Sequence, residues 1–427
     1  MKDLNFSYKN SWFWVLFVVF FSSGFVFFKV PFEFYFHYII IIFLTPLYFF
    51  KYGFPKLVIQ LFIVPLIVGI VHILLSNNLS FTFWKVFGGL VSVTLFFYYA
   101  IHHNNFNIRL VFKWYCKATY LLCLIAGIQI ISFLLGIKSG YDFSWFLNKW
   151  SFVEGGIVGF RVNSLLSEPT YLATVLAPSV FISVKNLLSK QNFIFNKSES
   201  IIIILTSIFT TSSIGYLGII ASFLLASNTI RIRYILIGLL ISVFSFNIAY
   251  WYVPDFRNRV DAAKGLWIDK NFSLSNTNNS SFVLYNNLHI AKENLINYPL
   301  FGTGLGSHET AFKKHTLTKT LIKYDFEFNI KDGNSLFVRL STETGLVGLF
   351  FVFLLIFKGF IYKVKYDDED LRLNSMISQS LFILFILVLV RQGNYMLNGL
   401  PMLFLIYYFN FIEYKTTVEK KYLLINP

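Results

Sequence analysis

The chain has 427 residues, of which 56% are hydrophobic and only 13% are charged, and its formal net charge is +15. Soluble globular domains carry roughly 25% charged residues, so this composition excludes an ordinary soluble domain. The excess of Lys and Arg would suit a nucleic-acid partner, but the sequence has no helix-turn-helix, zinc-finger or aromatic RNA-binding pattern. The composition therefore predicts an all-α polytopic membrane protein with no nucleic-acid partner.

Long apolar runs follow one another along the chain. A membrane-spanning helix needs about 20 apolar residues. The first run follows a basic start and has no cleavage site of small residues, so it is predicted to be a span and not a removed signal peptide. Spans are predicted near 11–28, 34–50, 57–75, 86–101, 118–136, 169–185, 234–252, 337–360, 375–391 and 399–412.

The run 201–227 needs a separate interpretation. It is too long for one span and too short for two full ones, and it is interrupted by the polar segment from Thr210 to Gly215. Ser, Thr and Gly suit a turn that is buried among other helices, where backbone groups find internal partners. We therefore expect two short helices that meet at this segment, which gives twelve passes in total.

Positive charge sets the predicted orientation, because short cytoplasmic loops are rich in Lys and Arg. With the N-terminus in the cytoplasm, the short outer loops hold only Lys29, Lys85 and Arg391. A single pass over 201–227 would instead place Arg231 and Arg233 outside. Both termini are thus expected in the cytoplasm. The predicted parts are N-terminal transmembrane helices (1–136), a first large periplasmic loop (137–168), central transmembrane helices (169–252), a large periplasmic loop (253–336), and C-terminal transmembrane helices with a cytoplasmic tail (337–427).

Ionisable residues gather at the predicted outer mouths of the spans. Arg161, Glu168 and Tyr171 lie where the first large loop enters a span, and a carboxylate is favoured at a helix start by the helix dipole. The plainer alternative is a helix cap with an interfacial anchor. Arg257 and Arg259 open the second large loop, and their planar guanidinium groups match phosphate oxygens. Their plainer alternative is a long side chain that reaches for the membrane interface.

Two further segments close the second large loop. The run from Pro299 to Gly306 has the spacing GxGxG without a preceding strand, which favours a tight turn that lets the backbone approach a ligand over a nucleotide-binding loop. His308, just after it, is either a proton-transfer group or a solvated loop histidine. Arg339 and Glu343 are four residues apart and share one helix face at the start of a span. They are either functional groups or an internal ion pair that neutralises both.

Taken in order, these segments resemble the O-antigen polymerase and O-antigen ligase superfamily of bacterial surface-polysaccharide enzymes. The resemblance covers roughly residues 118 to 412. It rests on short motifs: the Arg161 segment with Glu168-Pro169, the segment Thr210 to Gly215, the turn Pro299 to Gly306, and the segment Asn334 to Gly348 with Glu343-Thr344-Gly345.

The resemblance implies a bundle like that of the GT-C glycosyltransferases, which use lipid-phosphate sugars. Such an enzyme transfers a glycan from undecaprenyl pyrophosphate to a hydroxyl acceptor outside the inner membrane, with inversion and without a metal or other cofactor. Its partners would be the lipid-linked donor and acceptor, membrane lipid and a regulator of chain length. The expected catalytic candidates are Glu168, His308 and Glu343. The expected substrate-binding residues are Arg161, Tyr171, Arg257, Arg259, Asn334, Arg339 and Arg391.

Three other functions stay open at this point. The ligases of the superfamily carry a histidine near the end of the large loop, where this chain has Gly333 or Asn334, which favours a polymerase over a ligase. A flippase for lipid-linked oligosaccharides would also suit twelve passes, but its charged groups would be expected at mid-membrane depth and not at the outer mouth. The third alternative is a membrane scaffold without catalysis.

Overall fold

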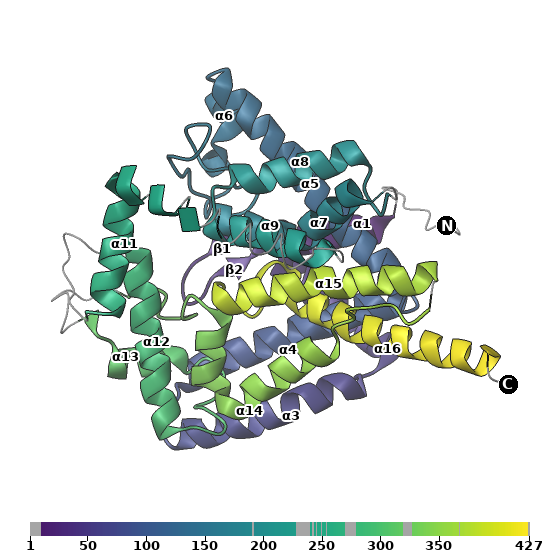
Figure 1. The fold of residues 1–427 in the computed structure, drawn as a ribbon. Helices are drawn as coiled ribbons and strands as arrows, with labels where there is room; N and C mark the ends of the chain where they lie inside the picture. Colours follow the sequence, from purple (N-terminus) through teal and green to yellow (C-terminus); the bar gives the residue numbers. More distant parts are fainter. Residues whose placement is uncertain are drawn as a thin grey trace.

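The computed structural model is mostly helical and describes residues 10–189, 192–227, 254–269, 279–318, 327–366 and 368–425, with scattered positions between 240 and 252 (Figure 1). Within this part, six helices are long and apolar enough to cross a membrane: α3 (Lys56–Leu74), α4 (Ser80–His103), α5 (Ile108–Leu134), α7 (Pro169–Leu188), α14 (Leu336–Lys358) and α15 (Glu369–Val390). The helical class of the fold is thus confirmed, and the twelve passes stay a prediction.

Further helices complete the bundle. The shorter apolar ones are α1 (Ser11–Phe21), α2 (Phe36–Tyr52) and α9 (Ser213–Ala226). The others are α6 (Lys138–Tyr141), α8 (Lys197–Phe209), α11 (Pro254–Trp267), α12 (Asn279–Asn297), α13 (His308–His315), α16 (Leu400–Ile425) and the 3-10 turns η1 (Phe143–Trp145) and η3 (Leu397–Gly399). Most of the predicted span 234–252 lies outside the described residues.

Burial divides the apolar helices into a centre and a periphery. Helix α7 packs against α5, α8, α9 and α15, and most of α7 and α15 is buried. Helix α3 instead leaves large apolar side chains exposed, among them Ile63, Ile67 and Leu74. Exposed apolar surface of this extent is unfavourable in water, so these outer helices suit a lipid environment.

The split of the run 201–227 into two short helices is confirmed. Helix α8 ends at Phe209, and α9 begins at Ser213. Between them the Thr210 hydroxyl donates to the Ser207 carbonyl at 2.7 Å and the Thr211 N–H donates to the Ile208 carbonyl at 3.0 Å, so the turn supplies partners for part of its own polar groups. A Cβ at Gly215 would lie 3.2 Å from Ala173 of α7, which shows how closely α9 packs there. Whether each half crosses the bilayer stays a prediction.

The predicted span 11–28 is wrong in its second half. Helix α1 ends at Phe21, and Val26–Phe28 forms strand β1, which pairs antiparallel with β2 (Phe34–Tyr35). A short run of Val and Phe suits a strand as well as a helix, so hydrophobicity alone does not separate them. The predicted last span, 399–412, falls at the start of α16, which continues past the apolar stretch through its charged second half to Ile425; that span stays a prediction.

Segments predicted to lie outside the membrane gather at one end of the bundle, here called the outer-loop end. Their contacts join loops that are far apart in the sequence. Examples of these hydrogen bonds run from the Lys149 N–H to the Gly24 carbonyl, from the Asn78 amide to the Leu305 carbonyl, from Arg161 Nε to the Thr210 carbonyl, and from the Gln392 N–H to the Asn334 carbonyl.

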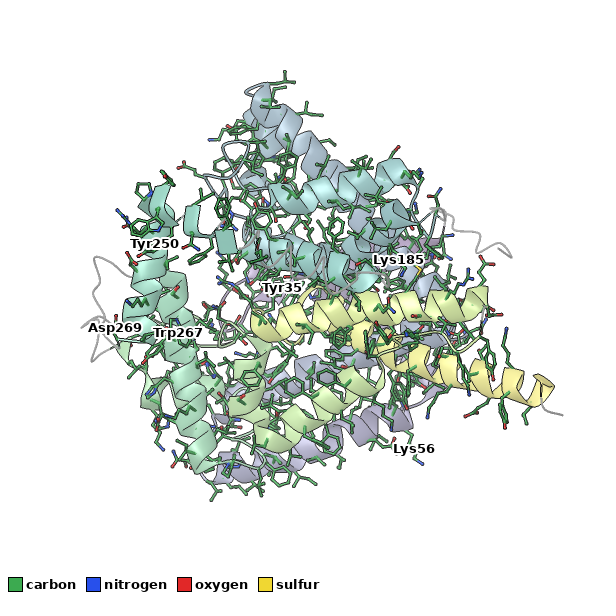
Figure 2. The ribbon with its side chains drawn as sticks, viewed as in Figure 1. Tyr35, Lys56, Lys185, Tyr250, Trp267 and Asp269 are labelled. Atoms are coloured by element: carbon green, nitrogen blue, oxygen red, sulfur yellow. The ribbon has the colours of Figure 1, made fainter. Side chains whose placement is uncertain are left out.

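Segments predicted to lie inside gather at the opposite end. Arg109 pairs with Asp370 and Glu413, and Lys117 pairs with Glu199 at 2.7 Å. Figure 2 shows the same division: Lys56 and Lys185 lie towards the right, whereas Trp267 of α11 lies towards the left. The loops predicted to lie on opposite sides of the membrane therefore do lie at opposite ends of the helix bundle. Which end faces outward stays a prediction.

Candidate functional site

A cavity of about 780 Å³ opens at the outer-loop end. Small-molecule sites in proteins usually enclose about 300–1,000 Å³, so a ligand of that class would fit. Its walls come from the β1–β2 hairpin, α2, α4, the start of α7, the segment 327–332 and the segment 394–396. The charged residues in its lining are Glu33, Lys85, Lys149, Glu309, Glu327, Lys331, Asp332 and Arg339.

One wall is fixed by an ion pair between the hairpin and the first large loop. Lys149 Nζ lies 2.5 Å from a carboxylate oxygen of Glu33, also donates to the Tyr35 hydroxyl, and lies 4.7 Å from the centre of the Tyr35 ring. Burial raises the pKa of Glu33, but the hydrogen bonds from Lys149 and Tyr35 outweigh it and hold that pKa below its usual value. Glu33 is therefore ionised at neutral pH and neutralises Lys149.

Two other cations in the lining are not neutralised in this way. Within the described residues, neither Lys85 nor Lys331 has an ion-pair partner; Lys85 Nζ lies 5.8 Å from the centre of the Phe81 ring. The nearby carboxylates are engaged elsewhere: Glu309 pairs with Lys313 at 2.8 Å, and Asp332 accepts hydrogen bonds from its own loop. The charges of Glu309 and Glu33 still reach Lys85, and the charge of Lys331 reaches Glu33, so both cations are attracted by carboxylates without being in a direct ion pair.

Arg339 reaches the cavity from a buried polar cluster. Its Nε donates to Glu343 at 2.9 Å, Nη1 donates to the Gly393 carbonyl at 2.9 Å, and its guanidinium lies 4.1 Å from the centre of the Tyr395 ring. The Tyr395 hydroxyl donates to the second oxygen of Glu343 at 2.8 Å. The predicted internal ion pair is confirmed. Glu343 is fully buried with both oxygens engaged, whereas Arg339 lines the cavity and can offer its remaining N–H groups.

Helix α14 is broken just beyond this pair, and the glycine-rich turn fills the break. Gly345 has φ 61° and ψ −160°, a conformation that only glycine adopts readily. The N–H groups of Thr303 and Gly304 donate to the Thr342 and Glu343 carbonyls that the break leaves free. The tight turn predicted for Pro299 to Gly306 is confirmed, and the element it approaches is α14.

The break is also satisfied on its other side. The N–H groups of Leu346 and Val347 donate to the carbonyls of Pro299 and Leu300, each at 2.9 Å. Four backbone hydrogen bonds therefore replace those that an unbroken helix would make, and they hold the turn and the helix in one fixed arrangement.

His308 is a buried link between three helices. Its Nδ1 lies 3.1 Å from the Thr342 hydroxyl, and its Nε2 lies 2.9 Å from the Asn287 side-chain oxygen. Burial, helped by the charge of Arg339, lowers the pKa of His308 to about 3, so the ring is neutral at physiological pH. The alternative of a solvated histidine is wrong, because the side chain is fully buried. His308 does not line the cavity.

Glu168 is next in the chain to a residue of the cavity wall but does not line the cavity itself. It precedes α7, and its neighbours Ser167 and Tyr171 line the cavity wall. Its carboxylate is reached by solvent but is enclosed on most sides by protein, and this loss of water raises its pKa. The positive charge of Arg391 opposes that rise.

The remaining predicted binding residues divide into two groups. Arg161 is half-buried with Nε directed to the Thr210 carbonyl at 3.3 Å, and its charge reaches Glu168. Asn334 has φ 60° and joins the end of the large loop to Gln392. Arg257 instead is exposed on α11, which packs against α12 and contributes nothing to the cavity wall. The side chain of Arg259 lies outside the described residues.

The sequence did not point to several cavity residues. Lys85 was counted only as a charge in an outer loop, and Lys149, Lys331, Glu33 and Tyr35 were not singled out. The usable signal was the scarcity of cations in the short outer loops, since any cation kept there needs an explanation.

Comparison of the chain with protein-family models and with curated proteins finds no match. The resemblance to the O-antigen polymerase and ligase superfamily therefore stays an expectation. Within the described residues, no group of three or more His, Cys, Asp or Glu side chains is arranged to hold a metal ion.

Proposed function

We propose that this chain is a membrane glycosyltransferase of the bacterial inner membrane. It polymerises oligosaccharide repeat units carried on undecaprenyl pyrophosphate at the periplasmic face, to build O-antigen, capsule or exopolysaccharide. The observation that carries the proposal is the cavity at the outer-loop end, which Lys85, Lys331 and Arg339 line together.

The charges of this cavity suit the cleavage of a glycosyl–pyrophosphate bond. The acceptor hydroxyl attacks the anomeric carbon, the new carbon–oxygen bond forms, and the bond to the pyrophosphate breaks with inversion. The electron pair leaves with the pyrophosphate, and cations placed in advance stabilise that charge. Lys85 and Lys331 would receive the leaving group, and Arg339, whose charge is balanced by Glu343, would add hydrogen bonds from its remaining N–H groups.

Glu168 is the best-supported proton acceptor among the three candidates. Both oxygens of Glu343 are engaged by Arg339 and Tyr395, and both ring nitrogens of His308 are engaged by side chains. Glu168 is the one of the three that is exposed to solvent, it lies between the lining residues Ser167 and Tyr171 in the chain, and its raised pKa brings it closer to the value that favours general base catalysis near neutral pH.

Gene deletion followed by gel analysis of the surface polysaccharide tests the proposal. Loss of a polymerase leaves single repeat units attached to the surface; loss of a ligase leaves no attached polymer; loss of a flippase traps the lipid-linked unit inside. Either of the last two patterns would reject the polymerase.

Complementation with variants tests the site. Glu168→Gln and Lys331→Ala should each give single units at normal protein level. Arg257→Ala, on the surface of α11, serves as the matched control and should give full-length polymer. Full-length polymer from both cavity variants would reject the assigned site.

A further inference from the structure

Helix α1 ends about halfway along the helix bundle. It starts at the end opposite the outer-loop end, where the ring centres of Trp12 and His103, the last residue of α4, are 5.4 Å apart. Near its end, Phe20 packs on Phe97 of α4 with ring centres 5.7 Å apart. Its 11 residues make about 16 Å, whereas the hydrocarbon core of a bilayer is about 30 Å thick. The chain therefore leaves this helix well inside the predicted hydrocarbon layer.

The β1–β2 hairpin leads from that depth to the start of α2. The last turn of α2 lies beside the start of α1, since the ring centres of Tyr48 and Trp12 are 5.6 Å apart. Helix α2 has 17 residues, so its first residue, Phe36, lies at most about 25 Å from that end of the bundle. Val26 pairs with Tyr35 directly before this point. The base of the hairpin therefore lies within the hydrocarbon core of about 30 Å, and its tip lies near the boundary of the core.

The outer edge of strand β1 is closed by the first large loop. Both backbone groups of Val26 bond to the side-chain amide of Asn148: the Val26 N–H donates to Oδ1 at 2.9 Å, and Nδ2 donates to the Val26 carbonyl at 2.6 Å. The Lys149 N–H donates to the Gly24 carbonyl at 3.0 Å. Open sheet edges do not occur in contact with hydrocarbon, because unpaired backbone groups are costly there. Residues 148 and 149 thus take the place of a third strand, which makes the base of the hairpin compatible with lipid.

The side chains of the hairpin divide into an apolar outer surface and a polar inner one. The outer side chains, here called the hairpin patch, are 40% to 84% exposed: Phe27, Phe28, Val30 and Phe36. Glu33 instead lines the cavity and pairs with Lys149. Lys29 is exposed beside the patch, and its long stem lets the ammonium group reach the headgroup layer. An exposed patch of large apolar side chains marks a contact with a protein or a membrane.

The hairpin patch continues the apolar surface of α2. The rings of Phe27 and Phe36 join the two elements, with ring centres 5.9 Å apart. Along α2 the same kind of surface continues with Ile42, Phe43 and Leu47, which are all exposed. A continuous apolar surface on a transmembrane helix and on the segment above it favours one common environment, and for the helix that environment is lipid.

We propose that the hairpin patch is inserted among the phospholipids of the leaflet at the outer-loop end. The depth of the hairpin, the closed edge of β1 and the continuity with α2 together favour lipid over a second copy of the chain or a soluble partner. Glu33 and Tyr35 of the same hairpin line the cavity, so insertion holds that cavity wall at a fixed depth in the membrane. The assignment does not use the proposed function and is tested separately from it.

A nitroxide spin label measures the depth of the hairpin patch. Val30→Cys is labelled in the full-length protein in nanodiscs of phosphatidylethanolamine and phosphatidylglycerol. The native Cys116 and Cys123 are buried, so the label attaches to the introduced thiol. Collisions of the label with molecular oxygen, which concentrates in hydrocarbon, are compared with collisions with a polar nickel chelate, which hydrocarbon excludes.

Ser139→Cys is the matched control. Ser139 is exposed in α6 and follows α5, whose 27 residues make about 40 Å and so extend beyond the hydrocarbon core. We expect the ratio of oxygen to nickel collisions to be about tenfold higher at residue 30 than at residue 139, because desolvation of the chelate keeps it out of the core.

Two results would overturn the assignment. A ratio at residue 30 equal to that of the control would place the hairpin patch in water. Low collision rates with both reagents would show that protein covers the patch, as in a contact between two copies of the chain. Should Val30→Cys fail to fold, Phe28→Cys takes its place with the same expected ratio.

Discussion

Replacing Gly345 with alanine should destabilise the protein strongly, although the change adds only one methyl group. An added Cβ at Gly345 would lie 2.5 Å from the Gly302 nitrogen and 2.6 Å from the Leu300 oxygen. Both atoms belong to the turn that fills the break in α14, so the turn must move away from the helix. Movement lengthens the backbone hydrogen bonds that join the two segments.

The size of the effect follows from two costs. A non-glycine residue held at φ 61° and ψ −160° costs about 1–3 kcal/mol in backbone strain. Four hydrogen bonds join the turn to the helix, and losing two of them costs about 2 kcal/mol. The expected loss for Gly345→Ala is therefore about 3–5 kcal/mol.

Unfolding by sodium dodecyl sulfate in mixed micelles measures this loss. Gly127→Ala is the control, since Gly127 lies within α5 with open space around it. It should leave stability unchanged or raise it by roughly 0.5–1 kcal/mol, because alanine favours helix over glycine. Equal stability of the two variants would show that the turn does not hold α14 in place.

Three further predictions follow from the site. Tyr395→Phe keeps the ring beside Arg339 and removes the hydrogen bond to Glu343, so it should lower the free energy of unfolding by about 1.5–3 kcal/mol in the same assay. Tyr395→Leu also removes the ring and should lower it further. Equal losses in the two variants would exclude a contribution from the ring. The pKa of His308 is lowered from 6.5 to about 3 in the folded protein, so the free energy of unfolding should fall as the pH drops from 6.5 towards 3. In His308→Gln the melting temperature should depend less on pH over this range. A pH dependence equal to that of the parent would contradict the prediction. The pKa of Glu168 is raised in the folded protein, so the contribution of this carboxyl to the free energy of unfolding is lost as the pH rises through that pKa. Glu168→Gln should therefore have a higher melting temperature than the parent at neutral pH and the same melting temperature in acid. A higher melting temperature of Glu168→Gln in acid as well would argue against the raised pKa.

Patterns confined to one segment could be predicted from the sequence. Apolar runs gave most of the helices, the polar segment at Thr210 gave the split between α8 and α9, and the spacing of Arg339 and Glu343 gave their ion pair. Each of these features depends on neighbours within a few residues. The β1–β2 hairpin was missed because Val and Phe favour either a strand or a helix, and packing decides between them.

The cavity could not be predicted in the same way, because its walls combine residues from position 23 to position 396. Lys85 has the same local pattern whether it sets topology or faces a ligand, and only its place beside Lys331 and Arg339 separates the two roles. His308 was misjudged for a related reason. Its burial depends on Asn287 and Thr342, which come from other helices.

The glycine-rich turn connects the two sides of the cavity. The Gly304 N–H donates to the Glu343 carbonyl of α14, which carries Arg339, and Gly302 packs so closely on α14 that an added Cβ would lie 2.5 Å from the Thr342 carbonyl. A Cβ at Gly306 would lie 2.8 Å from the Thr82 carbonyl of α4, one turn before Lys85. A rigid turn that touches both helices fixes the distance between these two cations. Preorganised charge is effective because it needs no rearrangement when the anion forms. The turn thus links the break in α14 to the electrostatics of the cavity, and backbone geometry at three glycines sets where the proposed leaving group is held.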